Sequence, residues 1–240
     1  MISSTSNKMI KDLKRLMLKK YRDKEGLFLV EGWHLIEEAH QANCLIKTIT
    51  TSEYQIDGVE NIIVSDEVIK TLSNFKSPPQ IIGVCRSFNN KLDYDHNYLI
   101  LDDVQDPGNV GTIIRNALAF NYKNIILSKG CADIYNEKVI QASQGAIFKL
   151  NIVREDILTK IIDLQSNKYK VIASSLSNAK PLTKNEVILD KKAIVLGNEG
   201  SGISSEVLDM VDISYYINIS NIDSLNVASA SSILLYQFSE

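Results

Sequence analysis

The sequence has 240 residues, of which 45% are hydrophobic, 23% charged and 7% aromatic. This length suffices for one large domain or two modest ones with hydrophobic cores, and the composition is typical of a soluble globular protein. No apolar run comes near the roughly 20 residues that a membrane helix needs, and the N-terminus lacks the apolar core of a secretory signal. The sequence therefore predicts a cytoplasmic protein without membrane contact.

The cysteines do not form a recognisable framework. Cys44, Cys85 and Cys131 are far apart in the sequence, and the three histidines do not cluster with them. An odd number argues against a set of disulfides, and the spacing argues against a zinc site with paired ligands. We therefore expect no metal site.

Charge is unevenly distributed, although the net formal charge is only −3. The first 24 residues contain eight lysines or arginines and two acidic residues, a net charge of +6, so the remaining 216 residues carry −9. A basic end of this kind is either the solvated face of an amphipathic helix or a contact surface for RNA. This segment alone does not decide between the two.

The N-terminal region predicts a small α/β unit. Residues 6–20 place apolar side chains at helical spacing, with lysines on the other face, and predict one helix. A strand is expected over residues 27–32, with a helix after it through residues 34–39. Further strands are expected over residues 44–51, 61–64 and 81–87, and one helix over residues 65–75. The unit ends near residue 87, and the polar, turn-rich residues 88–97 are the candidate linker.

From residue 98 onward, short apolar strands alternate with amphipathic helices, a pattern that predicts a mostly parallel sheet covered on both faces. Strands are expected over residues 98–103, 124–128, 149–153, 170–175, 191–197 and 213–219. Helices are expected over residues 109–120, through residue 139, and over residues 155–166, 204–210 and 224–238. Ligands of such sheets bind beyond the carboxyl ends of the strands. The loops after Asp102, Leu196 and Ile219 are therefore the candidate site.

The first loop leads into a helix with one clean apolar stripe, formed by Val110, Ile113, Ile114, Ala117 and Leu118. Arg115 lies off this stripe and faces away from the core. Asn109 lies near the predicted start of the helix, where an asparagine can cap it. Alone, this segment favours a plain cap and a solvated arginine over a catalytic pair.

The second loop has three glycines within six residues, Gly197, Gly200 and Gly202. Glycines allow a backbone to approach a flat ligand closely. The spacing matches neither a dinucleotide fingerprint nor a phosphate loop, and a tight connection explains it equally well. Glu199, between glycines at a strand end, is less easily explained that way.

The third loop leads into the last helix, which Ser224 is placed to cap. Residues 228–232 are all alanine or serine and give this helix an unusually small surface. Small residues permit close approach, either to the sheet or to another subunit. Of these two interpretations we favour the subunit interface.

Together, the three segments resemble the motifs of SpoU-type (TrmH) RNA methyltransferases, in the order and at the approximate spacing of that family. The motifs are Asn-x-Gly-x-x-x-Arg, Leu-Gly-x-Glu-Gly-x-Gly and Ser-Leu-Asn-Val-Ala, at residues 109–115, 196–202 and 224–228. Residues 19–39 resemble the substrate-binding domain of many rRNA-directed members. The resemblance implies an RNA substrate-binding domain over residues 1–90 and a methyltransferase domain over residues 97–240.

The resemblance also implies a SPOUT-type α/β fold with a deep C-terminal trefoil knot, a homodimer, and S-adenosylmethionine as cofactor. The cofactor residues that it implies are Gly197, Leu196, Leu225, Ser174 in the loop after Ala173, and Ile217. Family members usually have Ile-Pro where this chain has Ile217 and Asn218, and the turn here is about a residue shorter. Ile219 is therefore the alternative to Ile217.

The implied reaction moves a methyl group to a ribose 2'-hydroxyl, on large-subunit ribosomal RNA. The family assigns activation of the hydroxyl to the arginine that matches Arg115, but a guanidinium stays charged in proteins and is a poor proton acceptor. We expect Arg115 to hold a phosphate and stabilise developing alkoxide charge. The residues expected to fix the arginine, the ribose and the cofactor are Asn109, Glu199, Ser224 and Asn226. Phosphate contacts are expected from Lys11, Lys14, Arg15, Lys19, Lys20 and Arg22.

Other functions remain open. Transfer RNA is a possible substrate within the same family. A non-catalytic RNA-binding or ribosome assembly protein of the same fold is the nearest rival, but it would not need Asn109, Arg115, Glu199 and Asn226 all intact. A doubly wound nucleotide-dependent enzyme and a Rossmann-type base methylase are disfavoured, because the glycine fingerprint is missing after the first strand.

Overall fold

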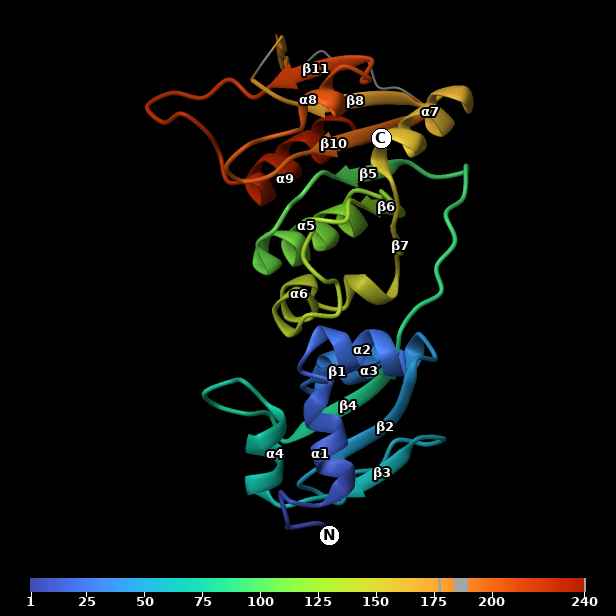
Figure 1. Ribbon diagram of the computed structural model, residues 1–240, viewed down its shortest axis with the longest axis vertical. Helices are drawn as coiled ribbons and strands as arrows, with labels where there is room; N and C mark the ends of the chain where they lie inside the picture. Colours follow the sequence, from blue (N-terminus) through green and yellow to red (C-terminus); the bar gives the residue numbers. More distant parts are fainter. Residues whose placement is uncertain (177, 184–189, 240) are drawn as a thin grey trace. The chain divides into compact units, whose positions relative to one another are not determined.

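The computed structural model describes residues 1–176, 178–183 and 190–239 (Figure 1). The chain forms two compact units. The N-terminal unit contains Met1–Asn89 and Asp133–Phe148, and the C-terminal unit contains Asn90–Ala132 and Lys149–Glu240. Residues 133–148 therefore pack in the N-terminal unit, although in sequence they lie inside the predicted methyltransferase domain. In the part of the chain that is described, no helix has both the length and the apolar character that crossing a bilayer requires.

The N-terminal unit is built on a four-stranded sheet in the order β1-β4-β2-β3. Its strands are β1 (Leu27–Glu31), β2 (Leu45–Thr50), β3 (Glu60–Ile63) and β4 (Ile81–Arg86). Strand β4 runs antiparallel to both neighbours, and β2 and β3 are parallel. The helices of the unit are α1 (Lys8–Arg15), α2 (Lys19–Glu25), α3 (Trp33–Gln41), α4 (Asp66–Leu72), α6 (Glu137–Ser143) and the short 3₁₀ helix η1 (Ala146–Phe148).

The helix predicted over residues 6–20 is wrong in its extent, because the chain breaks it into α1 and α2. The first helix ends at Arg15, and α2 begins after Leu18. The buried guanidinium of Arg22 explains the break: its Nη1 donates to the backbone carbonyls of Leu16 and Met17, at 2.9 and 3.0 Å. Carbonyls left without a helical partner are thereby satisfied.

The C-terminal unit contains a seven-stranded sheet in the order β7-β6-β5-β10-β8-β11-β9, and every neighbouring pair is parallel (Figure 1). The predicted parallel α/β fold is therefore confirmed. The strands are β5 (Tyr98–Leu101), β6 (Asn124–Leu127), β7 (Asn151–Arg154), β8 (Lys170–Ser174), β9 (Lys180–Pro181), β10 (Lys192–Leu196) and β11 (Ile213–Tyr216). The last of these ends three residues earlier than predicted, so Ile217 and Ile219 follow the strand.

Helices cover both faces of this sheet. One face packs with α7 (Ile157–Ser166) and α8 (Ser205–Leu208) in a single buried cluster that includes Tyr98, Val171 and Val195. Successive strand residues point to opposite faces. The other helices of the unit are α5 (Pro107–Ala119) and α9 (Val227–Gln237), which pack against each other, and α9 contacts β10.

The strand order places two loops side by side. From β5 the chain proceeds through β6 and β7 to one edge of the sheet and then crosses to β8; β10 is inserted between β5 and β8. Because β5 and β10 are parallel neighbours in register from Tyr98 to Leu101, their carboxyl ends lie together. Such a reversal of strand order is where open α/β sheets bind ligands.

Candidate active site

The loop after β5 ends in a cap on α5. Asp106 is the N-cap, and its Oδ1 accepts a hydrogen bond from the Asn109 backbone N–H at 2.8 Å. The predicted cap, Asn109, is wrong: Pro107 occupies the first helical position, where its missing N–H costs nothing. Asn109 is therefore the third residue of the helix, and its side chain is available for contacts with the neighbouring loops.

The loop after β10 folds back on itself. Two backbone hydrogen bonds of 2.9 and 3.0 Å join Asn198 and Gly202. A Cβ atom at Gly197 would lie 2.3 Å from the Gly202 carbonyl carbon, so no larger residue fits this close approach. The tight connection weighed from the sequence is present, and the glycine at residue 197 is needed for it.

Glu199 ties this second loop to the first. Its carboxylate accepts hydrogen bonds from the backbone N–H groups of Gln105 and Asp106, at 3.2 and 3.1 Å, and from Asn109 Nδ2 at 3.0 Å. In addition, Asn198 Nδ2 donates to the carbonyl of Asp103 at 2.8 Å. The two loops are thus held together by side chains of the second loop.

The hydrogen bonds to Glu199 also keep it ionised. Burial is the largest single influence and opposes ionisation, but the bonds from Asn109 and from the backbone together outweigh it and lower the pKa of Glu199. An ionised carboxylate that already accepts three hydrogen bonds is a weak base. Glu199 is therefore a positioning residue rather than a proton acceptor.

Asn226 brings in the third loop. Its Nδ2 donates to Asn109 Oδ1 at 2.9 Å, and its Oδ1 accepts from the Ala228 backbone N–H at 2.8 Å as the N-cap of α9. The predicted cap, Ser224, is wrong, because α9 begins only at Val227 and Ser224 lies outside the helix and exposed. We call Glu199, Asn109 and Asn226 the polar relay, since each is hydrogen-bonded to the next.

Asn116 of α5, which the sequence analysis did not predict to be important, is hydrogen-bonded to α9. Asn116 Nδ2 lies 2.8 Å from the hydroxyls of both Ser231 and Ser232, and 3.1 Å from the Ala228 carbonyl. The small residues of α9 thus let it pack closely on α5 of the same chain, a contact that the sequence analysis, which weighed the sheet and a second subunit, did not consider. Two apolar side chains of α9 are exposed: Ile233 by 40% and Tyr236 by 70%, although the Tyr236 ring also lies edge-to-face on Phe120 at the end of α5.

Arg115 and Ser224 are not part of the polar relay. Arg115 projects from α5 into solvent, and within the described ranges no side chain or carbonyl forms a hydrogen bond or ion pair with it. An arginine that no described residue holds is available to an external anion. Asp106, Asn198 and Asn116 are the positioning residues that sequence reasoning missed; Asp106 had a signal, because an aspartate before a proline commonly starts a helix.

The residues expected to hold the cofactor lie at or after the carboxyl ends of three neighbouring strands. Ser174 ends β8, Leu196 ends β10 and is followed by Gly197, and Ile217 follows β11. The side chains of Ile217, Ile219 and Leu225 are partly buried, whereas that of Leu196 is buried in the core. Apolar surface beside a glycine backbone suits a flat purine ring, so these residues fit the adenine of the expected cofactor. Leu196 can contribute only its backbone, because its side chain is buried in the core.

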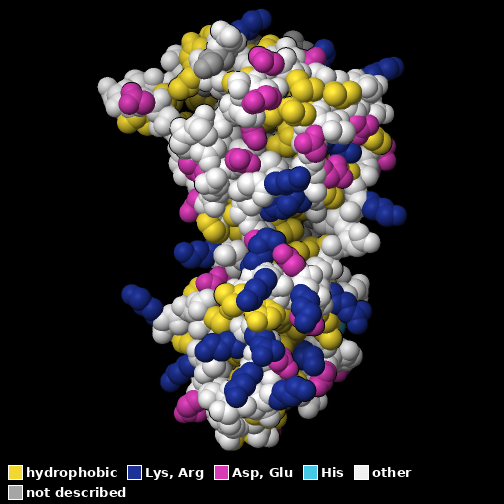
Figure 2. All heavy atoms as spheres, in the orientation of Figure 1, with side chains coloured by type: hydrophobic (Ala, Val, Ile, Leu, Met, Phe, Trp, Pro, Cys, Tyr) yellow, Lys and Arg dark blue, Asp and Glu magenta, His cyan; other side chains and the backbone are white. Residues whose placement is uncertain are grey.

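The predicted phosphate contacts belong to the N-terminal unit. Lys11, Lys14, Arg15, Lys19 and Lys20 are exposed. Figure 2 shows lysine and arginine side chains gathered over the face that carries α1 and α2. Arg22 differs: it is only 6% exposed, and its Nη2 lies 2.5 Å from Asp133 Oδ2. The prediction that Arg22 contacts RNA is wrong, because its guanidinium is buried within the unit. Among the described residues, no group of three or more potential metal ligands occurs.

Known proteins share both halves of this architecture. Residues 96–236 match the model of the SpoU rRNA Methylase family, and residues 7–83 match the MRM3-like substrate binding domain. The chain is 34% identical, over 98% of its own length and 97% of the relative's, to the 23S rRNA (guanosine(2553)-2'-O)-methyltransferase RlmP of Bacillus subtilis.

Among solved structures, the AdoMet-bound rRNA methyltransferase of Sinorhizobium meliloti superposes with a TM-score of 0.88 at 26% identity, covering 99% of this chain and 96% of the other. The predicted family is thereby confirmed. With its strand-end loops joined by the polar relay and its sequence matched over both halves, the chain belongs to the SpoU rRNA methylase family.

Proposed function

We propose that the protein transfers the methyl group of S-adenosylmethionine to a ribose 2'-hydroxyl of large-subunit ribosomal RNA. The observation that carries this proposal is the polar relay, in which Glu199, Asn109 and Asn226 join three strand-end loops through hydrogen bonds of 3.0 and 2.9 Å. Family membership gives the reaction class. The B. subtilis relative, named for 2'-O-methylation of 23S rRNA, supports the substrate.

The cofactor would be held at the carboxyl ends of β8, β10 and β11. Ser174, the Gly197 backbone and the apolar side chains of Leu225 and Ile217 or Ile219 supply its surface. The bound cofactor supplies an electrophilic methyl group on a sulfonium. The insertion of β10 between β5 and β8 is compatible with the trefoil knot that we expect in this unit.

Arg115 is the residue that we assign to the reacting hydroxyl. Because its guanidinium is exposed and held by no described group, it can bind the RNA phosphate beside the ribose and stabilise negative charge on the 2'-oxygen. The polar relay acts indirectly, by fixing the start of α5 and hence the base of the helix that carries Arg115.

The N-terminal unit is proposed to bind the RNA through Lys11, Lys14, Arg15, Lys19 and Lys20, with residues 1–90 as the substrate-binding domain. A cytoplasmic homodimer is the expected form. The exposed Ile233 and Tyr236 on α9 supply apolar surface for a second subunit.

Ribose methylation mapped on ribosomal and transfer RNA, from cells with and without the gene, tests the proposal. The expected result is one 2'-O-methyl mark on large-subunit RNA that disappears with the gene. Loss of a mark on transfer RNA instead would change the substrate but keep the reaction. Identical maps would contradict the proposed activity.

A further inference from the structure

A groove of about 640 Å³ lies within the N-terminal unit, beside α1 and α2. The buried side chains of Leu13 and Leu16 and the partly buried Met9 and Leu27 make it apolar inside. Its volume lies within the range of about 300–1,000 Å³ that is typical of small-molecule sites. None of its lining residues belongs to the strand-end loops described above, and only Arg15 among them is one of the phosphate contacts proposed so far.

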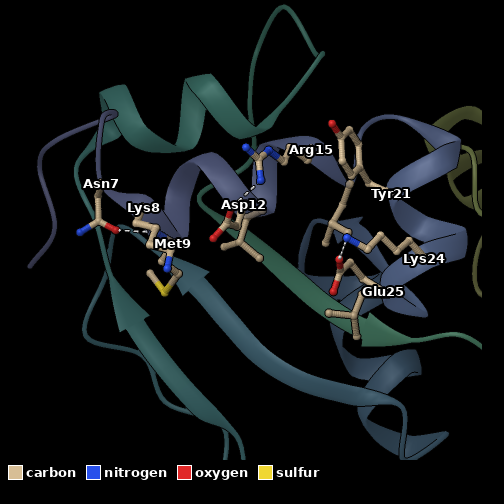
Figure 3. Close-up of a pocket in the computed structure, with 11 residues that line it drawn as sticks. Asn7, Lys8, Met9, Asp12, Arg15, Tyr21, Lys24 and Glu25 are labelled. Carbon is tan, nitrogen blue, oxygen red and sulfur yellow. Dashed lines mark hydrogen bonds and ion pairs between the residues drawn. The ribbon is translucent and has the colours of Figure 1, made fainter.

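The aromatic residue in this groove is Tyr21, on α2. Its ring is partly buried and carries two cations: the Arg15 guanidinium carbon lies 5.7 Å from the ring centroid, and Lys20 Nζ lies 4.9 Å from it. Figure 3 shows Arg15 between Tyr21 and Asp12, to which it is hydrogen-bonded. An aromatic ring flanked by cations on a basic surface is the arrangement on which proteins stack unpaired bases.

The polar groups around the groove suit a nucleotide better than a phosphate alone. Lys8, Arg15 and Lys24 line it together with the carboxylates of Asp12 and Glu25. The cations would attract the phosphates of an RNA backbone. The carboxylates can accept hydrogen bonds from the exocyclic amino groups of bases. Figure 2 shows the same combination, with apolar surface surrounded by lysines and arginines. The net charge of +6 over the first 24 residues supplies the complementarity to RNA.

We propose that this groove binds one unpaired nucleotide of the RNA substrate, with its base stacked on Tyr21 and its flanking phosphates neutralised by Arg15, Lys20 and Lys24. The proposal rests on the proposed function, since it takes RNA as the substrate. Arg15 and its partner Asp12 are exposed at 59% and 50%, so the Arg15 side chain has room to move aside for the base. In a continuous duplex the bases are stacked on one another, and none is free to enter. The N-terminal unit therefore selects RNA with an unpaired nucleotide.

The test measures binding of the full-length protein to a short mixed-sequence oligoribonucleotide that carries one 2-aminopurine. The proteins compared are the wild type, Tyr21→Ala and Tyr21→Phe. We expect binding to quench the fluorophore, Tyr21→Ala to weaken binding by about 10-fold and abolish the quenching, and Tyr21→Phe to stay within about 2-fold of the wild type. With the same oligonucleotide annealed to its complement, the wild type and Tyr21→Ala should bind equally.

Tyr54→Ala is the matched control, because Tyr54 is a 55% exposed tyrosine of the same unit that does not line the groove. A thermal melt of each variant shows that it is folded. Equal affinity of the wild type and Tyr21→Ala for the single strand would overturn the proposal, and it is the result expected if the groove instead binds a protein. An equal loss in Tyr54→Ala or in the duplex would overturn it as well.

Methyl transfer to ribosomal RNA by the same wild-type preparation separates this proposal from the proposed function. If the wild type methylates the RNA and Tyr21→Ala binds single strands as tightly as the wild type, only the proposal that the groove binds a nucleotide is refuted. Absence of any methylation by a folded, cofactor-binding wild type would refute the proposed function.

Discussion

The two units use polar side chains in opposite ways. In the C-terminal unit, Glu199, Asn109 and Asn226 are hydrogen-bonded to one another, so their geometry is set before any ligand arrives. In the N-terminal unit, Lys11, Lys14 and Lys20 lie exposed over α1 and α2. Preorganised groups contribute strongly and individually to a reaction, whereas exposed charges contribute weakly and additively to binding. Substitutions in the two units should therefore differ in size and in kind.

The largest effect is expected at Arg115. Arg115→Ala should lower the rate of methyl transfer by about 100-fold or more, because it removes the group that stabilises charge on the 2'-oxygen. Single-turnover rates with a saturating cofactor measure this. Affinity for the cofactor should change little, whereas RNA binding should weaken by the loss of one phosphate contact. Arg115→Lys is the matched control, since it keeps the charge but loses the planar, bidentate fork; near-normal turnover in Arg115→Lys would reduce the role to a plain charge effect.

The second effect is on stability, whose dependence on pH should have opposite signs in the two units. Burial, with the charge of Glu137, raises the pKa of Glu31 to about 7 against the lowering effect of the Ser73 hydrogen bond. When a carboxyl holds its proton more tightly in the folded state, the stability it contributes is present below its unfolded pKa and is lost as the pH rises. The N-terminal unit should therefore lose of the order of 2–3 kcal/mol as the pH rises from 4.5 to about 7.

Glu31→Gln checks this expectation, because the amide mimics the protonated acid. Urea unfolding at several pH values should show a loss of stability in the wild type that is absent from Glu31→Gln. In the C-terminal unit the sign is reversed. The lowered pKa of Glu199 means that its contribution is present above the ordinary carboxyl pKa and is lost as the pH falls through the lowered value. The same pH dependence in Glu31→Gln and the wild type would show that Glu31 is not the cause.

A smaller effect tests the polar relay without breaking the fold. Asn226→Asp keeps an oxygen to cap α9 but loses the Nδ2 that donates to Asn109, whereas Asn226→Ala loses both. Asn226→Ala should cost about 1 kcal/mol of stability, and Asn226→Asp should unfold close to the wild type. Both should slow methyl transfer, by about 10-fold for the loss of one hydrogen bond. Full activity in Asn226→Asp would mean that the contact with Asn109 is dispensable.

The smallest effect is expected from single lysines of the N-terminal unit. Each of Lys11→Gln and Lys14→Gln should make the dependence of log K on log salt less steep by about 0.7–0.9, because each removes one phosphate contact. Binding titrations at several salt concentrations measure the slope. Lys70→Gln, on α4, is the exposed control that should leave it unchanged. An unchanged slope in the first two variants would remove them from the RNA contacts.

Local pattern predicted most of this architecture, and tertiary contacts explain the exceptions. The strands and helices of the parallel sheet follow from apolar runs and periodicity, so the strand-end loops could be located in advance. The break between α1 and α2 depends on the Arg22 guanidinium, which reaches carbonyls five and six residues away, and periodicity carries no sign of that. Strand β9 has two residues and is too short for any pattern.

The caps show the same limit at smaller scale. Ser224 and Asn109 have the chemistry of caps, but Asn226 and Asp106 hold those positions. The hydrogen bond between Asn109 and Glu199 joins residues 90 positions apart. The motifs predicted that these residues matter, whereas their contacts follow only from the strand order that places β10 beside β5.

Ribose 2'-O-methylation by this protein is tested most directly by a methyl-transfer assay with purified protein, large-subunit ribosomal RNA and radiolabelled S-adenosylmethionine, followed by alkaline hydrolysis of the RNA. A methyl group on a 2'-oxygen blocks cleavage at the adjacent phosphodiester. We expect label in one alkali-resistant dinucleotide, and strongly reduced label with Asn109→Ala protein. Label on a base, or undiminished label with a folded Asn109→Ala variant, would contradict it.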